Sequence, residues 1–296
     1  MTRIAFFDTE TTGLEDAGPH EMWEFGMVLR RDDDPTTDTE YAWQWVVDLT
    51  HADPKALEIN GYHTRNQALR AGMAPGQGVA VTDAARWLIP NPVERSEAGE
   101  LFVAPLTTLQ IAWTIGELLD GAHVAAANVD FDVRFTKKFL QAHRIKARWD
   151  YHHVEIQSYA AGRRGLRPPW KFATLLDLYG VPLPEGAAHT ALGDARGVRD
   201  LWDACLAEVL QAQDDFNRDP KALAWARGHV QRKLDRVRGF QQVAQDRGDE
   251  DVMRRWRGVG NFLQREFIGG VGCVVAAFDE RSPEFAKQLD RARRPG

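Results

Sequence analysis

Cysteine is scarce in this chain, whose 296 residues include only Cys205 and Cys273, far apart and in no paired spacing. Disulfide frameworks and structural zinc sites need closely spaced cysteines, so the sequence excludes both classes and favours a reducing compartment. Long apolar runs are also missing, since no run approaches the roughly 18 residues of a membrane-spanning helix. We therefore expect a soluble cytoplasmic protein with no signal peptide and no membrane partner.

Basic residues are in the minority, because 37 lysines and arginines face 43 aspartates and glutamates, for a net charge of −6. The net charge differs between the two parts of the sequence. Residues 211 to 296 carry 17 basic and 13 acidic residues, a net charge of +4, which leaves −10 for residues 1 to 210. Two interpretations of the basic tail stay open: contacts to phosphates, or a solvated helix face.

Two acidic residues stand at the end of the first apolar run. Asp8 and Glu10 follow Ile4 to Phe7 and begin the stretch DTETTGL at residues 8 to 14. Side chains alternate across a strand, so the two carboxylates project from the same face, where they repel each other unless a cation lies between them. The pattern predicts a metal site at a strand end.

A second motif, NVDFD, occupies residues 128 to 132 after another apolar run. The apolar residues that follow recur at helical spacing, so the motif lies at a strand-to-helix junction. Its spacing selects Asp132 as a further metal ligand and leaves Asp130 as a surface residue.

A third motif, HTALGDA, occupies residues 189 to 195 and opens a long segment with one apolar stripe. Asp194 is therefore expected in the first turns of a helix, with His189 just before it. Together the three motifs supply four carboxylates and one imidazole.

In content and order these motifs resemble those of the DEDDh 3′-to-5′ exonucleases, the DnaQ-like branch of the ribonuclease H-like fold. The resemblance covers about residues 1 to 212. It extends to three shorter stretches, WEFG at 23 to 26, LEING at 57 to 61 and LLDLYG at 175 to 180. It implies an α/β fold with a mixed five-stranded sheet, one strand antiparallel, flanked by helices.

The resemblance also implies the roles of the site residues. Asp8, Glu10, Asp132 and Asp194 would hold two divalent cations, and His189 would be the general base. Paired ions can activate a water and stabilise the leaving oxygen, and oxygen ligands suit Mg²⁺ or Mn²⁺. A histidine side chain titrates near pH 6.5, so its neutral form can accept the proton of water near neutrality.

The substrate implied by the resemblance is DNA with a free 3′ end, preferably single-stranded, degraded to nucleoside 5′-monophosphates in replication or repair. Thr12, Leu14 and Phe131 are the candidate substrate contacts, the last two by stacking on terminal bases. Phe131 has an alternative role as a core residue. Two other functions stay open: an exoribonuclease of the same group, and a non-catalytic relative that binds nucleic acid or a polymerase.

Apolar periodicity predicts the elements of this exonuclease domain. We expect strands at 3 to 9, 22 to 31, 41 to 49, 122 to 127 and 148 to 156, and helices at 54 to 60, 106 to 119, 131 to 143, 171 to 179 and 188 to 211. Residues 66 to 105 are rich in glycine and proline and predict a long insertion. We interpret it as a packed flap near the active-site edge, anchored by Trp87, Leu88 and Ile89.

Residues 219 to 296 are predicted to form a helical C-terminal domain that begins at Asp219-Pro220. Two amphipathic helices, at 223 to 240 and 252 to 267, would form a hairpin through a turn at 247 to 249. A strand or buried segment at 271 to 278 and a last helix from Ser282 would follow. This domain is the candidate surface for a replication or repair partner, for docking on the nuclease, for extending the substrate groove or for a dimer.

Overall fold

The structure is a computed structural model that describes residues 3–16, 18–31, 34–89, 93–95, 101–184 and 186–257. The chain divides into two compact units, Met1–Cys205 and Leu206–Gly296. The division falls inside helix α9 (Ala191–Arg218), ahead of the predicted start at Asp219. Asp219 instead caps the next helix, α10 (Pro220–Asp246), by accepting a hydrogen bond from the Lys221 amide. None of the helices in the described ranges is long and apolar enough to span a bilayer.

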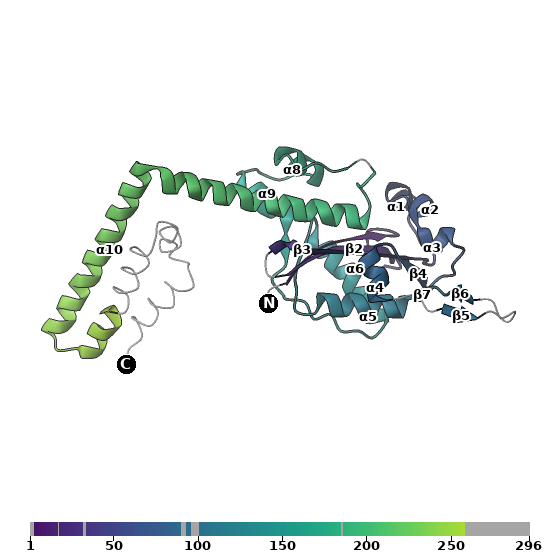
Figure 1. Ribbon diagram of the computed structural model, residues 1–296, viewed down its shortest axis with the longest axis horizontal. Helices are drawn as coiled ribbons and strands as arrows, with labels where there is room; N and C mark the ends of the chain where they lie inside the picture. The colour runs from purple at the N-terminus through teal and green to yellow at the C-terminus, as the bar shows by residue number, and fades with distance from the viewer. Residues whose placement is uncertain are drawn as a thin grey trace. The chain divides into compact units, whose positions relative to one another are not determined.

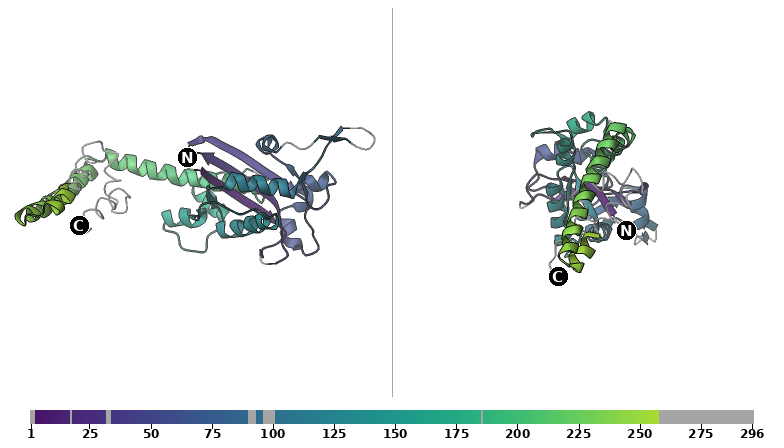
Figure 2. Two further views of the ribbon diagram at one scale, coloured as in Figure 1. Left: turned by 90° about the horizontal axis from the view of Figure 1, so that it is seen from below. Right: turned by 90° about the vertical axis from the view of Figure 1, so that its left-hand side faces the viewer.

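The first unit is an α/β structure around a mixed seven-stranded sheet with the strand order β7-β4-β3-β2-β1-β8-β9. Its strands are β1 (Arg3–Thr11), β2 (Met22–Arg31), β3 (Asp34–Trp45), β4 (Gln77–Ala80), β7 (Leu106–Thr107), β8 (His123–Ala126) and β9 (Val154–Glu155). Strands β1, β8 and β9 are parallel, whereas β2 is antiparallel to both β1 and β3, its neighbours in Figure 2. The expectation was five strands; β4 and β7 are additional.

Helices cover both faces of this sheet (Figure 1). Helices α5 and α6 pack on one face, and α7, α8 and the first part of α9 pack on the other. The helices ahead of α9 are α1 (Pro54–Ile59), α2 (Tyr62–Arg65), α3 (Gln67–Arg70), α4 (Asp83–Leu88), α5 (Thr108–Leu119), α6 (Val129–Ala142), α7 (Ile156–Arg163) and α8 (Phe172–Leu178).

Strand β1 divides its side chains between two apolar cores. Ala5 and Phe7 belong to the core under α5 and α6, and Phe6 belongs to the core under α7, α8 and α9. Since side chains alternate along a strand, Asp8 and Glu10 project on the same side as Phe6. The strand thus directs both carboxylates toward the face that α9 covers.

A buried arginine links α9 to the sheet through ion pairs. Arg30 on β2 is 3% exposed and forms ion pairs with Asp38 on β3 at 2.8 Å and with Asp203 on α9 at 2.6 Å. Planar guanidinium groups suit such multiple pairing, and burial of the charge is tolerated because two carboxylates oppose it.

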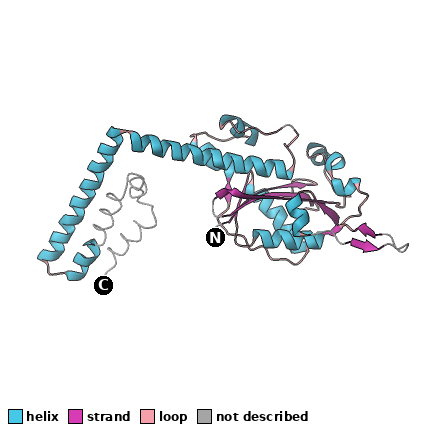
Figure 3. Cartoon of the chain, in the orientation of Figure 1, coloured by secondary structure: helices cyan, strands magenta, loops and turns pink. Residues whose placement is uncertain are grey.

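The insertion at 66 to 105 contains regular structure. Strand β4 pairs with β3 in the main sheet, and α4 packs beside it. A separate hairpin of β5 (Val93–Arg95) and β6 (Leu101–Val103) follows, drawn as two short arrows in Figure 3. The predicted anchor is wrong for Trp87 and Leu88, which are 86% and 47% exposed, but Ile89 does pack against the core. Ala85 is the residue of α4 that is buried.

The strand predicted at 148 to 156 is also mostly wrong. Only Val154–Glu155 form a strand, and helix α7, which the periodicity did not indicate, begins directly afterwards. Glu155 starts this helix, since its carboxylate accepts hydrogen bonds from the amides of Gln157 at 3.1 Å and Ser158 at 2.7 Å. The other predicted elements of the domain lie where expected, with shifted ends.

The second unit contains α10 and a further helical segment at 250–257, and the predicted turn at 247–249 lies between them. Phe240 and Trp256 stack with ring centroids 4.6 Å apart, and Val237 and Ala244 are buried. This arrangement agrees with the predicted hairpin as far as residue 257. The remainder of its second helix, the strand at 271 to 278, the helix from Ser282 and Cys273 lie outside the described residues.

Candidate metal centre

Three carboxylates meet at the end of β1. Asp8, Glu10 and Asp194 each offer an oxygen, and these oxygens lie within 4.8 Å of one another. Asp8 and Glu10 come from one face of β1, and Asp194 comes from the first turn of α9, more than 180 residues later. The fold therefore assembles one all-oxygen cluster from two of the three sequence motifs.

Glycine at position 26 lets α9 reach this cluster. Gly26 on β2 is the cross-strand partner of Asp8. A Cβ atom there would lie 2.2 Å from the Leu192 amide nitrogen and 2.3 Å from the Ala191 carbonyl carbon, so only a residue without a side chain admits the helix. The start of α9 consequently lies directly on β2, with Asp194 beside Asp8.

Asp132 approaches the cluster from the first turn of α6 and is buried. One of its oxygens accepts hydrogen bonds from the Thr9 amide at 3.0 Å and the Thr9 hydroxyl at 2.8 Å. Asp132 is not one of the three residues whose oxygens share the 4.8 Å cluster, but its charge is near enough to raise the pKa of Asp8. The two bonds from Thr9 fix its orientation.

His189 lies just ahead of α9 and is exposed. Its backbone has a φ of +58°, an unfavourable left-handed conformation for a residue with a side chain, and its amide donates to Asp194 at 3.1 Å. The surrounding structure therefore holds the backbone of His189 next to Asp194.

The surroundings of the cluster disfavour the charged forms of its carboxyl groups. Burial first, and then the neighbouring carboxylates, raise the pKa of Asp8 and Glu10 well above the ordinary range of a carboxyl group. Burial likewise raises the pKa of Asp132 to about 7, and it raises the pKa of Asp194 to about 6 although His189 acts in the opposite direction. A divalent cation is what such a set of oxygen ligands would accommodate.

A fifth carboxylate, to which no sequence motif gave a role, lies beside the cluster. Glu24 on β2 is the cross-strand partner of Glu10, is 3% exposed and is the first of the charged neighbours that raise the pKa of Glu10. It accepts hydrogen bonds from Gln44 at 2.9 Å and from Arg65 at 2.9 Å. The alternation of β2 and its pairing with β1 could have located Glu24, but no sequence signal placed Arg65 beside it.

The predicted substrate contacts occupy different environments. Thr12 is buried, and its hydroxyl accepts a hydrogen bond from the Glu21 amide at 2.9 Å, so its side chain is committed to the turn after β1. Leu14 is 74% exposed and free to contact a ligand. Phe131 is partly buried against the core with its ring centroid 4.8 Å from that of Phe135, which matches its alternative role as a core residue.

Asp130, predicted to be a surface residue, is exposed and forms an ion pair with Arg134 at 3.1 Å. Its charge does not belong to the carboxylate cluster.

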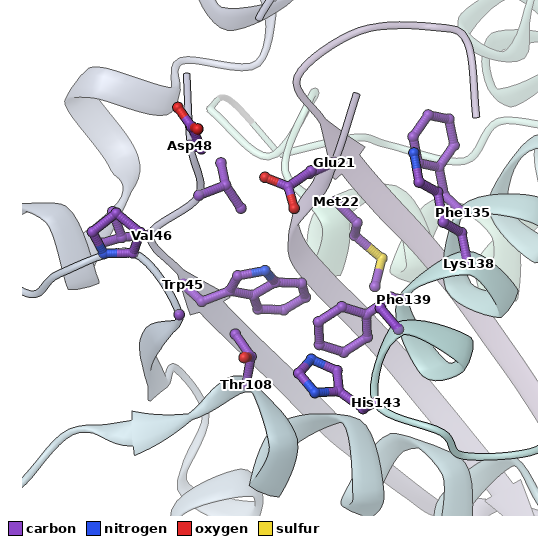
Figure 4. Close-up of a pocket in the computed structure, with 14 residues that line it drawn as sticks. Glu21, Met22, Trp45, Val46, Asp48, Thr108, Phe135, Lys138, Phe139 and His143 are labelled. Carbon is purple, nitrogen blue, oxygen red and sulfur yellow. The ribbon is translucent and has the colours of Figure 1, made fainter. Parts of the chain in front are cut away.

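A separate aromatic pocket of about 330 Å³ opens on the α6 side of the sheet (Figure 4). One wall is formed by Trp45, Phe139 and His143, with ring centroids 4.7 Å apart for the first pair and 5.1 Å for the second. Glu21 and Asp48 lie among its lining residues. None of the four predicted metal ligands lines this pocket, so it is distinct from the carboxylate cluster.

No protein-family model matches the chain, and no curated protein is significantly similar to it. The geometry and charge of the site are therefore the basis on which a function can be inferred.

Proposed function

We propose that this chain is a metal-dependent 3′-to-5′ exonuclease of the DnaQ-like, ribonuclease H-like type. The observation that carries the proposal is the convergence of Asp8, Glu10 and Asp194 within 4.8 Å, with Asp132 and His189 adjoining. The strand order β3-β2-β1-β8-β9, in which β2 alone is antiparallel, supports it, because this is the mixed five-stranded arrangement that the resemblance implies.

The four carboxylates are the proposed ligands of two divalent cations, Mg²⁺ or Mn²⁺. Such ions, when bound, would activate a water and stabilise the charge of the leaving oxygen. Asp8 faces the other three proposed ligands, since Asp132, Asp194 and Glu10 all raise its pKa. Thr9 holds Asp132 in place through two hydrogen bonds, so its carboxylate is oriented before any ion binds.

His189 is the proposed general base. Its exposure leaves the ring accessible to water and substrate, and its amide contact to Asp194 ties it to the cluster. A neutral imidazole accepts the proton of the attacking water, which then adds to phosphorus as the bond to the 3′ oxygen of the neighbouring nucleotide breaks. The products would be a nucleoside 5′-monophosphate and a strand shortened by one nucleotide.

Single-stranded DNA with a free 3′ end is the proposed substrate, and the cytoplasm the proposed location. The exposed Leu14, at the end of the first motif, supports a contact to the terminal base. The second unit, with α10 and the segment at 250–257, is the proposed surface for a replication or repair partner.

The direct test is degradation of 5′-labelled DNA and RNA strands of one sequence, with Mg²⁺, with Mn²⁺ and with a chelator. We expect a ladder that shortens from the 3′ end only when metal is present, with DNA degraded faster. A strand whose 3′ end is blocked by an inverted linkage is the control and should stay intact. Faster loss of RNA would assign an exoribonuclease. Binding without any shortening would assign the non-catalytic alternative, and cleavage of the blocked strand would contradict an exonuclease.

A further inference from the structure

A second concave surface adjoins the carboxylate cluster, on the face of the sheet that α9 covers. This groove has a volume of about 540 Å³, within the range of roughly 300–1,000 Å³ that ligand sites occupy. Its floor is formed by Glu24 and Gln44, whose side chains are hydrogen-bonded to each other at 2.9 Å. Because Glu24 is the cross-strand partner of Glu10, the groove adjoins the cluster.

The walls of the groove come from α2 and α3 on one side and from α9 on the other. We call it the arginine groove and define it by six of its lining residues: Thr64, Arg65, Gln67, Arg70, Thr190 and Arg196. Every one of these side chains can donate hydrogen bonds. The charged residues of the whole lining are these three arginines and Glu24, a net charge of +2 in a part of the chain, residues 1 to 210, that carries −10.

Two of the arginines are held in fixed positions. Arg65 is 24% exposed and donates to Glu24 at 2.9 Å and to the Asn60 carbonyl at 2.7 Å. Arg196 is 44% exposed and donates to Glu40 through two nitrogens, at 2.8 and 2.5 Å. Arg196 pairs through one edge of its guanidinium and can offer its remaining Nη1 to a phosphate with little further loss of rotamer entropy, whereas Arg65 already donates from all three of its nitrogens.

The third arginine is available for a ligand. Arg70 is exposed, and its one hydrogen bond among the described residues goes to the Arg65 carbonyl at 3.3 Å. No carboxylate in the described ranges lies within ion-pair distance of it. An anion is the ligand that this charge would attract.

We propose that the arginine groove binds the backbone phosphates of the nucleic-acid strand whose 3′ end lies at the carboxylate cluster. The inference rests on the proposed function and adds to it the path of the strand, which would run from Asp194 between α9 and α3. The aromatic pocket of Figure 4 does not compete for phosphates, since its charged lining is Glu21, Asp48 and Lys138, and Lys138 donates to two backbone carbonyls.

The test is the affinity of a fluorescent single strand of about 20 thymidylates, measured by anisotropy with chelator present so that no degradation occurs. The wild-type chain is compared with Arg70→Gln at salt concentrations between roughly 50 and 200 mM. Arg148→Gln is the matched control, because it removes one positive charge from an exposed arginine that does not line the groove.

We expect Arg70→Gln to weaken binding about fivefold and to reduce the slope of log affinity against log salt by about 0.7, the value for one single-strand phosphate contact. Arg148→Gln should leave both quantities unchanged. Hydrolysis of thymidine 5′-(p-nitrophenyl phosphate), which has no second phosphate, should be unaffected by Arg70→Gln.

Equal affinity and equal salt slope for the wild-type chain and Arg70→Gln would overturn the proposal that the arginine groove binds phosphates, whatever the nuclease activity. A different result would separate the two proposals. If Arg70→Gln bound the strand more weakly but the wild-type chain degraded no strand, phosphate binding by the groove would be supported and the exonuclease activity would be contradicted. Absence of binding by the wild-type chain would overturn the groove as well.

Discussion

At the scale of single residues, Asp8 lies in surroundings that disfavour a charged carboxylate. Its carboxylate is shielded from water and faces the charges of Asp132, Asp194 and Glu10. An ordinary structural carboxylate would be paired with a base, and burial of an unpaired one is costly. A site of this kind is retained for function at the expense of stability.

We predict that Asp8→Asn lowers metal-dependent turnover at least about 10³-fold, because a ligand of the two proposed metal ions is lost. The same change should raise the free energy of unfolding of the metal-free chain by about 1 kcal/mol or more, since it removes one buried negative charge. Turnover and chemical denaturation measure the two effects. Asp130→Asn, at an exposed acid two residues from Asp132, is the matched control and should change neither. Full activity in Asp8→Asn would point to another site.

The raised pKa values predict how stability depends on pH. Asp132 and Asp194 titrate at about 7 and about 6 in the folded chain and near 4 when unfolded. Between these limits the folded chain binds more protons at these two groups, so their contribution to stability is full below about pH 4 and decreases as pH rises toward 7. We expect the melting temperature of the metal-free chain to fall from pH 5 to pH 8, and Mg²⁺ to raise it more at pH 8. Equal effects of Mg²⁺ at both pH values would argue against binding by these carboxylates.

His189 provides a separate test of the chemical step. We predict that His189→Ala lowers kcat by about 10²- to 10⁴-fold with a much smaller change in KM, since a general base acts on the attacking water rather than on substrate binding. Steady-state kinetics on a single-stranded oligonucleotide separate the two constants. His152→Ala, at an exposed histidine paired with Asp150, is the control. A large rise in KM at unchanged kcat would assign His189 to substrate binding instead.

At the scale of secondary structure, the contact between α9 and β2 determines whether the site forms. A methyl group at position 26 would overlap the backbone of Ala191 and Leu192. We predict that Gly26→Ala destabilises the fold by about 1–3 kcal/mol and lowers turnover, because α9 must move and carries Asp194 with it. Chemical denaturation and turnover measure both effects.

Gly162→Ala is the matched control for Gly26→Ala. Gly162 lies within α7, where an added Cβ would meet nothing within 4 Å. Since alanine favours a helix over glycine, this change should leave turnover unchanged and slightly stabilise the fold. If the two variants had the same stability and turnover, the close contact at Gly26 would not control the site.

Sequence periodicity predicted most of the long helices and strands of the first unit but not the short ones. Strand β2 has the predicted bounds, because its ten residues form one nearly continuous buried run. The pattern around Val154 and Ile156 did not distinguish a strand from a helix, since apolar residues there suit either. Helix α7 depends instead on Glu155 as its cap. Trp87 was misplaced because apolar composition does not fix which face of a short helix is buried.

The site itself was predicted in part. The alternation of β1 explains why Asp8 and Glu10 share a face, and this followed from the sequence alone. The approach of Asp194 depends on the absence of a side chain at Gly26, a contact between distant elements that no local pattern reveals. Arg65 and Arg70 were not recognised for the same reason, because α2 and α3 are four residues each and show no usable period.

At the scale of the whole molecule, charge distribution and fold give different information. The net charge of −10 on residues 1 to 210 does not suggest a partner made of phosphates, yet the arginine groove concentrates positive charge beside the cluster. The local arrangement of charges, rather than the total net charge, governs how strongly a polyanion is attracted. Divalent ions at the carboxylates would further reverse the charge that an approaching strand meets.

Titration of the metal-free chain with Mn²⁺, followed by electron paramagnetic resonance, shows whether these carboxylates hold metal ions. We expect two bound Mn²⁺ ions with a spin-coupled spectrum, loss of that coupled spectrum in Asp8→Asn and its retention in Asp130→Asn. Failure of the wild-type chain to bind Mn²⁺, or an unaltered coupled spectrum in Asp8→Asn, would contradict a metal centre built on these carboxylates.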